Sequence, residues 1–331
     1  MANFYKEPKR KFFRKRLSLV ALLAFITFGF VVRTPAQDDG NVIRIDTELA
    51  VFEVLVEDKA GKPVHGLRAD DFRVYENGKE RRIDFFQPVI STGNNRPMMV
   101  VFAVDVSGSM TNAEIAKLRK AIDGFIDRFG DYRSYFSLVS FAMNVKTIQK
   151  FTNRPEEVRK ALSKLDRDQD GRSTHAFDAV DLAVRQIDRS SPKSLDGQVP
   201  KRAVILITDG FPVGDTVSAS TVTERANRSG TSVYAIILPS FSPIQRDSKP
   251  LMTLLEASGL IEKTGGSTLY AVNDNMEPLF SKLAEEISAS YAIAFYPMEK
   301  SDVENEKRTV TIESKNGYRI KQNRKTYELR K

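Results

Sequence analysis

The stretch Asp105-Val106-Ser107-Gly108-Ser109-Met110 directly follows an uninterrupted apolar run, residues 98–104. An apolar run bounded by loop-forming residues is typical of a central strand in a parallel sheet. Ligands of open α/β sheets bind just beyond the carboxyl ends of such strands. The alternate Asp, Ser and Ser of this turn can point their oxygens at one spot, which suits a hard cation such as Mg²⁺. A short Asp/Ser/Gly cluster is also an ordinary helix-capping loop, so the turn alone leaves both interpretations open.

Two later segments favour the cation hypothesis. Residues 202–208 (R-A-V-I-L-I-T) are predicted to form a second strand with a continuous apolar interior, and this strand also ends on an acidic turn, Asp209-Gly210. Between the two runs, residues 171–178 contain Thr174 in a loop that leads into a helix. The chain therefore offers further oxygen donors at two separate places.

The order and placing of these residues resembles the von Willebrand factor A (VWA) family and its metal-ion-dependent adhesion site. That site has D-x-S-x-S after the first strand, a Thr on a middle loop and an Asp in a T-D-G turn after the fourth strand. The resemblance covers about residues 96–290 and implies a divalent cation, Mg²⁺ or else Mn²⁺ or Ca²⁺. It also implies an α/β fold with a doubly wound, mostly parallel, Rossmann-like sheet, as does the alternation of strands and helices. The implied metal ligands are Asp105, Ser107, Ser109, Thr174 and Asp209.

The resemblance implies a binding function and no enzyme activity. In the family the two Asp residues act mostly through water and the hydroxyls are neutral, so the cation attracts an Asp or Glu carboxylate from a protein partner. The resemblance therefore implies a role in adhesion or in the assembly of an envelope complex. The alternative is a metal-dependent, phosphatase-like hydrolase that uses Asp105. It is opposed by Ser107, which replaces the second carboxylate of a D-x-D phosphatase, and by the lack of a P-loop. A purely structural role for an occupied site is a third possibility.

His175, beside Thr174, invites a catalytic interpretation. The sequence shows no Ser–His–acid arrangement that includes it, so we expect it to pack or to donate a hydrogen bond to a neighbouring group. Asp178 is expected to cap the following helix and to steady the Thr174 loop.

Charge and cysteine content exclude several function classes. The net charge is +8, but residues 1–36 hold eight Lys or Arg and one Glu, whereas the rest of the chain holds 43 Lys or Arg and 42 Asp or Glu. The basicity therefore belongs to the leader and predicts no nucleic-acid partner. The chain has no cysteine, which excludes disulfides, thiolate metal sites and cysteine nucleophiles.

The first 36 residues read as a secretory signal peptide. A basic segment, residues 6–16, precedes sixteen uncharged residues, 17–32, and small residues follow near a cleavage point after Ala36. The alternative is an uncleaved N-terminal anchor, although the apolar stretch is shorter than the ~20 residues of a spanning helix. Both readings predict export to the periplasm, cell envelope or exterior, with membrane contact only through an uncleaved leader.

Residues 42–90 are predicted to form a small β-sandwich-like module. Residues 72–75 and 83–86 alternate in polarity around Asn77-Gly78, a strong hairpin signal. Residues 56–79 resemble the N-terminal portion of an exported, acidobacterial-type VWA-related family. Residues 291–331 also have β character, and we hypothesise that they complete the 42–90 module around a VWA domain at 97–290, because either piece alone buries little apolar area.

Two acidic patterns are interpreted as solvated turns and not as calcium sites. Residues 166–171 match the start of a calcium loop, but Phe177 stands where an EF-hand needs a Glu. The acids at positions 57, 58, 70 and 71 lie in turn-rich sequence. Helical spacing predicts helices over residues 113–129, 156–165, 217–228, 251–264 and 276–289.

Overall fold

The structure is a computed structural model that describes residues 49–88, 96–129, 133–168, 173–238, 252–271, 275–298 and 307–328. All of them belong to one compact unit, Ile43–Lys331. The predicted leader, the loop at 239–250 and part of the calcium-like pattern, residues 169–171, lie outside the described residues. Within the described ranges, no helix combines the length and the apolar character needed to cross a membrane.

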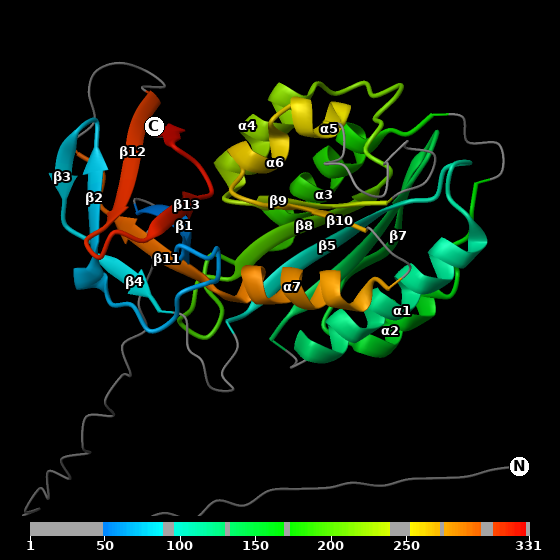
Figure 1. The fold of residues 1–331 in the computed structure, drawn as a ribbon, viewed down its shortest axis with the longest axis horizontal. Helices are drawn as coiled ribbons and strands as arrows, with labels where there is room; N and C mark the ends of the chain where they lie inside the picture. Colours follow the sequence, from blue (N-terminus) through cyan, green and yellow to red (C-terminus); the bar gives the residue numbers. More distant parts are fainter. Residues whose placement is uncertain are drawn as a thin grey trace, which may run out of the picture. The chain divides into compact units, whose positions relative to one another are not determined.

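The larger sheet has six strands in the order β10-β9-β8-β5-β6-β7 (Figure 1). Neighbouring strands are parallel except for β7, which runs antiparallel to β6. The sheet confirms the predicted doubly wound, mostly parallel fold. Its strands are β5 (Met98–Asp105), β6 (Tyr135–Phe141), β7 (Val145–Thr152), β8 (Lys201–Thr208), β9 (Ser232–Ile237) and β10 (Thr268–Tyr270).

Helices cover both faces of this sheet. Along β5, Phe102 packs into a core with α1 (Asn112–Phe129), α2 (Pro155–Leu162) and α7 (Glu277–Ser288). Its neighbours Val101 and Ala103 pack into a second core. Burial on both faces explains why the run at 98–104 carries no polar residue. The second core contains residues of α3 (Ala176–Ser190), α4 (Ala219–Ser229), α5 (Leu254–Ala257) and α6 (Leu260–Lys263).

The single helix predicted over residues 251–264 is wrong, because the segment forms the two short helices α5 and α6. Gly259 separates them with a φ of 71°, a left-handed conformation that ends a helix and that glycine adopts at little cost. Thr253 begins α5 as an N-cap, and Glu256 completes a capping box with it.

Strands from both ends of the described chain combine in two further antiparallel sheets. One has the order β13-β1-β11-β4, and the other has the order β14-β12-β2-β3 (Figure 1). Side chains of both sheets share one apolar core that includes Phe52, Val74, Tyr291 and Ile312. We propose that the two segments form one composite β-domain. Its strands are β1 (Ala50–Glu57), β2 (Phe72–Glu76), β3 (Lys79–Arg81), β4 (Phe85–Gln87), β11 (Ser290–Phe295), β12 (Lys307–Ser314), β13 (Arg319–Gln322) and β14 (Thr326–Glu328).

The predicted hairpin has the expected turn but a different second strand. Asn77 and Gly78 both have positive φ, 47° and 78°, and join β2 to β3. This two-residue turn pairs Glu76 with Lys79. The partner strand β3 is only three residues long and ends at Arg81. The second hairpin strand was predicted over residues 83–86, but Phe85 and Phe86 instead belong to β4, which pairs with β11 in the other sheet.

Three of the four acids singled out in this region have protein partners. A short 3-10 helix, η1 (Ala69–Asp71), precedes β2. The Asp58 carboxylate accepts hydrogen bonds from the backbone of Ala60 and Lys62 in the turn after β1. Asp71 accepts from the Arg68 backbone, and Glu57 forms an ion pair with Lys321.

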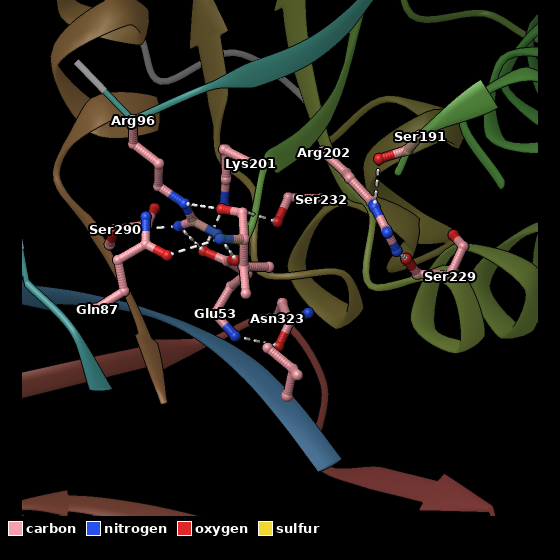
Figure 2. A network of polar contacts seen from close by, with 12 residues as sticks. Glu53, Gln87, Arg96, Ser191, Lys201, Arg202, Ser229, Ser232, Ser290 and Asn323 are labelled. Carbon is pink, nitrogen blue, oxygen red and sulfur yellow. Dashed lines mark hydrogen bonds and ion pairs between the residues drawn. The ribbon is translucent and has the colours of Figure 1, made fainter. Parts of the chain in front are cut away.

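A buried ionic cluster joins β1 to the large sheet (Figure 2). Arg96 donates to both carboxylate oxygens of Glu53, and the contact from Nη1 to Oε2 measures 2.8 Å. The ammonium of Lys201, at the start of β8, lies 3.6 Å from Glu53 Oε2. Asn323 fixes the backbone of Glu53 with two further hydrogen bonds. The carboxylate therefore connects elements that are distant in sequence.

Candidate metal centre

The turn after β5 brings three of the predicted ligands together. Asp105 is fully buried, and its Oδ1 accepts a hydrogen bond of 2.9 Å from the backbone N–H of Ser107. The hydroxyl oxygens of Ser107 and Ser109 lie 3.0 Å apart. The backbone N–H of Glu114 donates a 3.2 Å hydrogen bond to Oγ1 of Thr111, which caps the start of α1 directly behind the turn.

The fourth predicted ligand, Asp209, lies at the same edge of the sheet. It directly follows β8, which is the parallel neighbour of β5, with Val104 paired to Ile207. Asp209 is nearly buried, and its Oδ1 accepts from the backbone N–H of Phe211 at 3.2 Å. The parallel register therefore places the two predicted carboxylate ligands at adjacent strand ends.

Thr174 is attached to the loop that follows Asp209. Its backbone N–H donates to the carbonyl of Val213 at 3.0 Å, and the N–H of Val213 donates back at 2.9 Å. His175 N–H donates to the carbonyl of Ala142, just beyond β6. Thr174 thus lies where the loops after β6 and β8 meet, at the carboxyl edge of the sheet.

The electrostatics of Asp105 fit a bound cation. Burial raises the pKa of Asp105 to about 6; hydrogen bonds from Ser107 and Thr208 act against this rise, and the Asp209 carboxylate adds to it. No cation of the described residues is among the main influences on this carboxylate. Two carboxylates and nearby hydroxyls make a donor set of hard oxygens, which suits a divalent cation such as Mg²⁺. No group of three or more His, Asp or Glu that could hold a metal occurs in the described ranges, so the hydroxyls are essential to this fit.

Sequence reasoning missed two residues that shape the site. Thr208 was assigned only to the apolar strand, yet its hydroxyl holds Asp105 Oδ2 at 2.8 Å. Gly210 adopts a φ of 88°, and a Cβ there would lie 2.8 Å from Cγ2 of Thr253. The T-D-G pattern contained both signals, because its Thr and Gly flank Asp209.

His175 and Asp178 hold the loop after β8. The expected hydrogen bond of His175 is confirmed, but the expectation that Asp178 caps α3 is wrong, because His175 occupies the N-cap position and the Asp178 carboxylate is bound to the loop after β8. Nδ1 of His175 lies 3.1 Å from Oδ2 of Asp178. The Asp178 carboxylate also accepts from the backbone N–H groups of Thr216 and Val217 at 3.0 and 2.8 Å. Burial raises the pKa of Asp178, but these hydrogen bonds outweigh it and the pKa lies below its ordinary value.

Curated relatives match only a part of this chain. Inter-alpha-trypsin inhibitor heavy chain H4 of Sus scrofa is 33% identical over 124 residues, which are 36% of this chain and 13% of that protein. The Bos taurus protein of the same name is 30% identical over 123 residues, with the same coverage. The chain therefore spans 13% of the length of these relatives.

Several solved structures are also similar. BatB from Bacteroides thetaiotaomicron is 20% identical, with a TM-score of 0.44, and the match covers 58% of this chain and 97% of that one. Proximal thread matrix protein 1 from the mussel byssus, with a zinc-occupied MIDAS motif, is 16% identical with a TM-score of 0.46. That match covers 62% of this chain and 49% of the mussel protein.

A family model assigns the domain. The model of the von Willebrand factor type A domain matches residues 100–276, more than half of the chain. The matched range includes both strand-end turns of the site and the loop between them. This chain therefore belongs to the von Willebrand factor type A domain family.

Proposed function

We propose that the VWA domain binds one divalent cation and uses it to bind a carboxylate of a partner protein. The observation that supports this most strongly is the burial of Asp105 beside Asp209, with no ion pair between either carboxylate and a Lys, Arg or His of the described residues. An ionised carboxylate in such a place is costly unless a positive charge accompanies it. The proposed ligands are Asp105, Ser107, Ser109, Thr174 and Asp209, with Mg²⁺ as the proposed ion and Mn²⁺ or Ca²⁺ as alternatives.

The arrangement of the donors supports recognition of an acidic group. Oδ1 of Asp105 accepts from Ser107 and Oδ2 accepts from Thr208, so protein donors already satisfy part of its negative charge. Ser107 and Ser109 contribute neutral hydroxyls. A bound divalent cation would supply an electrophilic centre whose charge these groups only partly neutralise. An Asp or Glu carboxylate of a partner is the ligand that such a centre favours.

We propose a binding module and not an enzyme. Asp105 is held from both carboxylate oxygens, which suits a fixed ligand and not a nucleophile that must approach a substrate. The neighbouring His175 is directed at Asp178, which in turn holds the loop at Thr216. The geometry therefore favours the binding function over the phosphatase-like alternative.

Export is part of the proposal. It is supported by the basic segment at residues 6–16 and the uncharged stretch at 17–32. The proposed location is the periplasm, the cell envelope or the exterior, where the domain would take part in adhesion or in the assembly of an envelope complex. The partner is a protein, and nucleic acid is not proposed as a ligand.

Electron paramagnetic resonance of Mn²⁺ tests the cation site directly. Titration of Mn²⁺ into the metal-free full chain should show one retained ion per chain, because bound Mn²⁺ loses the sharp signal of the free ion. Mg²⁺ should displace it. Asp209→Asn should lose retention, whereas Asp188→Asn, a change at an exposed position of α3, should keep it. Equal retention by Asp209→Asn, or none by the wild type, would contradict the proposal.

A further inference from the structure

Exposed apolar side chains gather around the candidate metal centre. The described residues include seven exposed large apolar side chains, and five of them belong to loops or helix starts near this edge of the sheet. The exposed fraction reaches 74% at Met252 and 59% at Leu254. The other two, Tyr296 and Tyr318, belong to the segments of the smaller sheets. We call the five side chains the apolar collar: Met143, Phe211, Val213, Met252 and Leu254.

Two collar residues are connected directly to proposed metal ligands. The backbone N–H of Phe211 donates to the Asp209 carboxylate at 3.2 Å. Val213 exchanges two backbone hydrogen bonds with Thr174. These side chains are 39% and 53% exposed, so they extend into solvent from backbone that is fixed to the site.

The other three collar residues lie one step further from the site. Met252 and Leu254 flank Thr253, whose side chain lies against Gly210, and Leu255 N–H points at the Gly210 carbonyl at 3.4 Å. Met143 follows Ala142, whose carbonyl accepts from the N–H of His175 beside Thr174. The collar is therefore drawn from three separate loops that the site's own hydrogen bonds hold together.

We infer that the apolar collar contacts apolar side chains that flank the acidic residue of the partner. This inference rests on the proposed function, because it describes the surroundings of the same carboxylate. Exposed apolar side chains that cluster on a protein surface mark interaction sites. Their burial against a partner would also remove water from the contact between cation and carboxylate, which strengthens that contact. The partner segment is a protein loop or terminus with Asp or Glu between residues such as Leu, Ile, Phe or Met.

Phage display tests the inference. A library of short random peptides is selected on the immobilised full chain in millimolar Mg²⁺, and bound phage are eluted with EDTA. Recovered peptides should carry Asp or Glu with apolar residues beside it. A synthetic peptide of the recovered sequence should bind the double variant Phe211→Ser, Leu254→Ser at least about tenfold more weakly than the wild type. Tyr318→Ser, a matched change at an exposed aromatic residue outside the collar, should bind as the wild type does.

The Mg²⁺-induced rise in the unfolding temperature separates the two proposals. It should be the same in the double variant and the wild type, because neither collar side chain is a proposed ligand. Three results would overturn the collar inference if this temperature rise is present. They are recovery of acidic peptides with polar flanks, failure to recover any metal-dependent peptide, and equal binding of the peptide by the double variant and the wild type. Absence of the rise in the wild type would instead overturn the metal site, and the collar inference with it.

Discussion

The hydroxyl of Thr208 donates a 2.8 Å hydrogen bond to Oδ2 of Asp105, and both residues are fully buried. The contact joins the ends of the two neighbouring strands β5 and β8. It fixes the carboxylate from β8 while Ser107 fixes it from its own turn. The orientation of Asp105 thus depends on a strand that begins almost a hundred residues later.

Replacement of Thr208 by Val should lower the free energy of unfolding of the metal-free chain by about 1–3 kcal/mol at neutral pH. Valine keeps the shape of the side chain but leaves the buried carboxylate of Asp105 without one donor. Urea unfolding of the full chain measures the change. Thr208→Ser, which retains the hydroxyl, should recover most of the loss, and a Val variant as stable as the wild type would refute this role.

Replacement of Glu53 by Gln should lower the free energy of unfolding by about 3–5 kcal/mol, because the buried cations Arg96 and Lys201 lose their counter-charge. Burial raises the pKa of Glu53, but the two cations outweigh it and hold the pKa below its ordinary value. Denaturant unfolding checks the prediction. Glu313→Gln, at an exposed position of β12, serves as the matched control and should change little. Similar losses in both variants would contradict the importance of the buried cluster.

The stability of the wild type should rise with pH relative to Lys201→Met. Burial lowers the pKa of Lys201 to about 8, although Glu53 acts in the opposite direction. Between this value and the unfolded pKa of 10.5 the unfolded chain binds more protons than the folded chain, so the folded state gains stability as pH increases. The gain should be roughly 2–3 kcal/mol between about pH 7 and pH 10.

Urea unfolding of the wild type and of Lys201→Met between about pH 7 and pH 10 measures the pH effect. Titratable groups that the two proteins share cancel in the difference between their free energies of unfolding. The groups around Lys201 are Glu53, Arg96, the hydroxyl of Ser232 at 3.2 Å and the ring of Tyr234. A difference that stays constant, or that moves in favour of Lys201→Met, would contradict the assignment.

Residues 97–290 expressed alone should unfold in one cooperative transition. The two cores that cover the large sheet draw all their residues from positions 98–287, whereas the core of the smaller sheets draws its residues from positions 50–86 and 291–327. The fragment should be less stable than the full chain, because Lys201 loses Glu53. Circular dichroism during heating measures this, and a fragment without a cooperative transition would contradict the proposed domain boundaries.

Sequence reasoning worked where local pattern and burial agree. Residues 98–104 and 203–207 lack polar side chains because β5 and β8 are buried on both faces, so the central strands and the acidic turns that follow them were predictable. The pairing of strands that are distant in sequence was not predictable. Residues 83–86 resembled the second strand of a hairpin, and only the tertiary structure places Phe85 and Phe86 beside β11.

The surroundings of the site were harder to predict for a physical reason. Thr208 differs from its apolar neighbours in the strand only by one hydroxyl, and its role depends on contact with Asp105, 103 positions away. One helix was predicted over residues 251–264, but Gly259 divides this segment, and Leu254 is 59% exposed. β14, with three residues, was too short to predict from its pattern.

Thermal unfolding of the full chain in the presence of metal tests the cation site most directly. Mg²⁺ and then Mn²⁺ are titrated into the wild type and into the variants Asp105→Ala and Asp209→Ala. A ligand that binds only the folded state raises its stability by mass action, so the unfolding midpoint should increase with metal in the wild type and stay constant in both variants. No increase in the wild type at millimolar metal, with both variants folded and indistinguishable from it, would contradict the proposed metal centre.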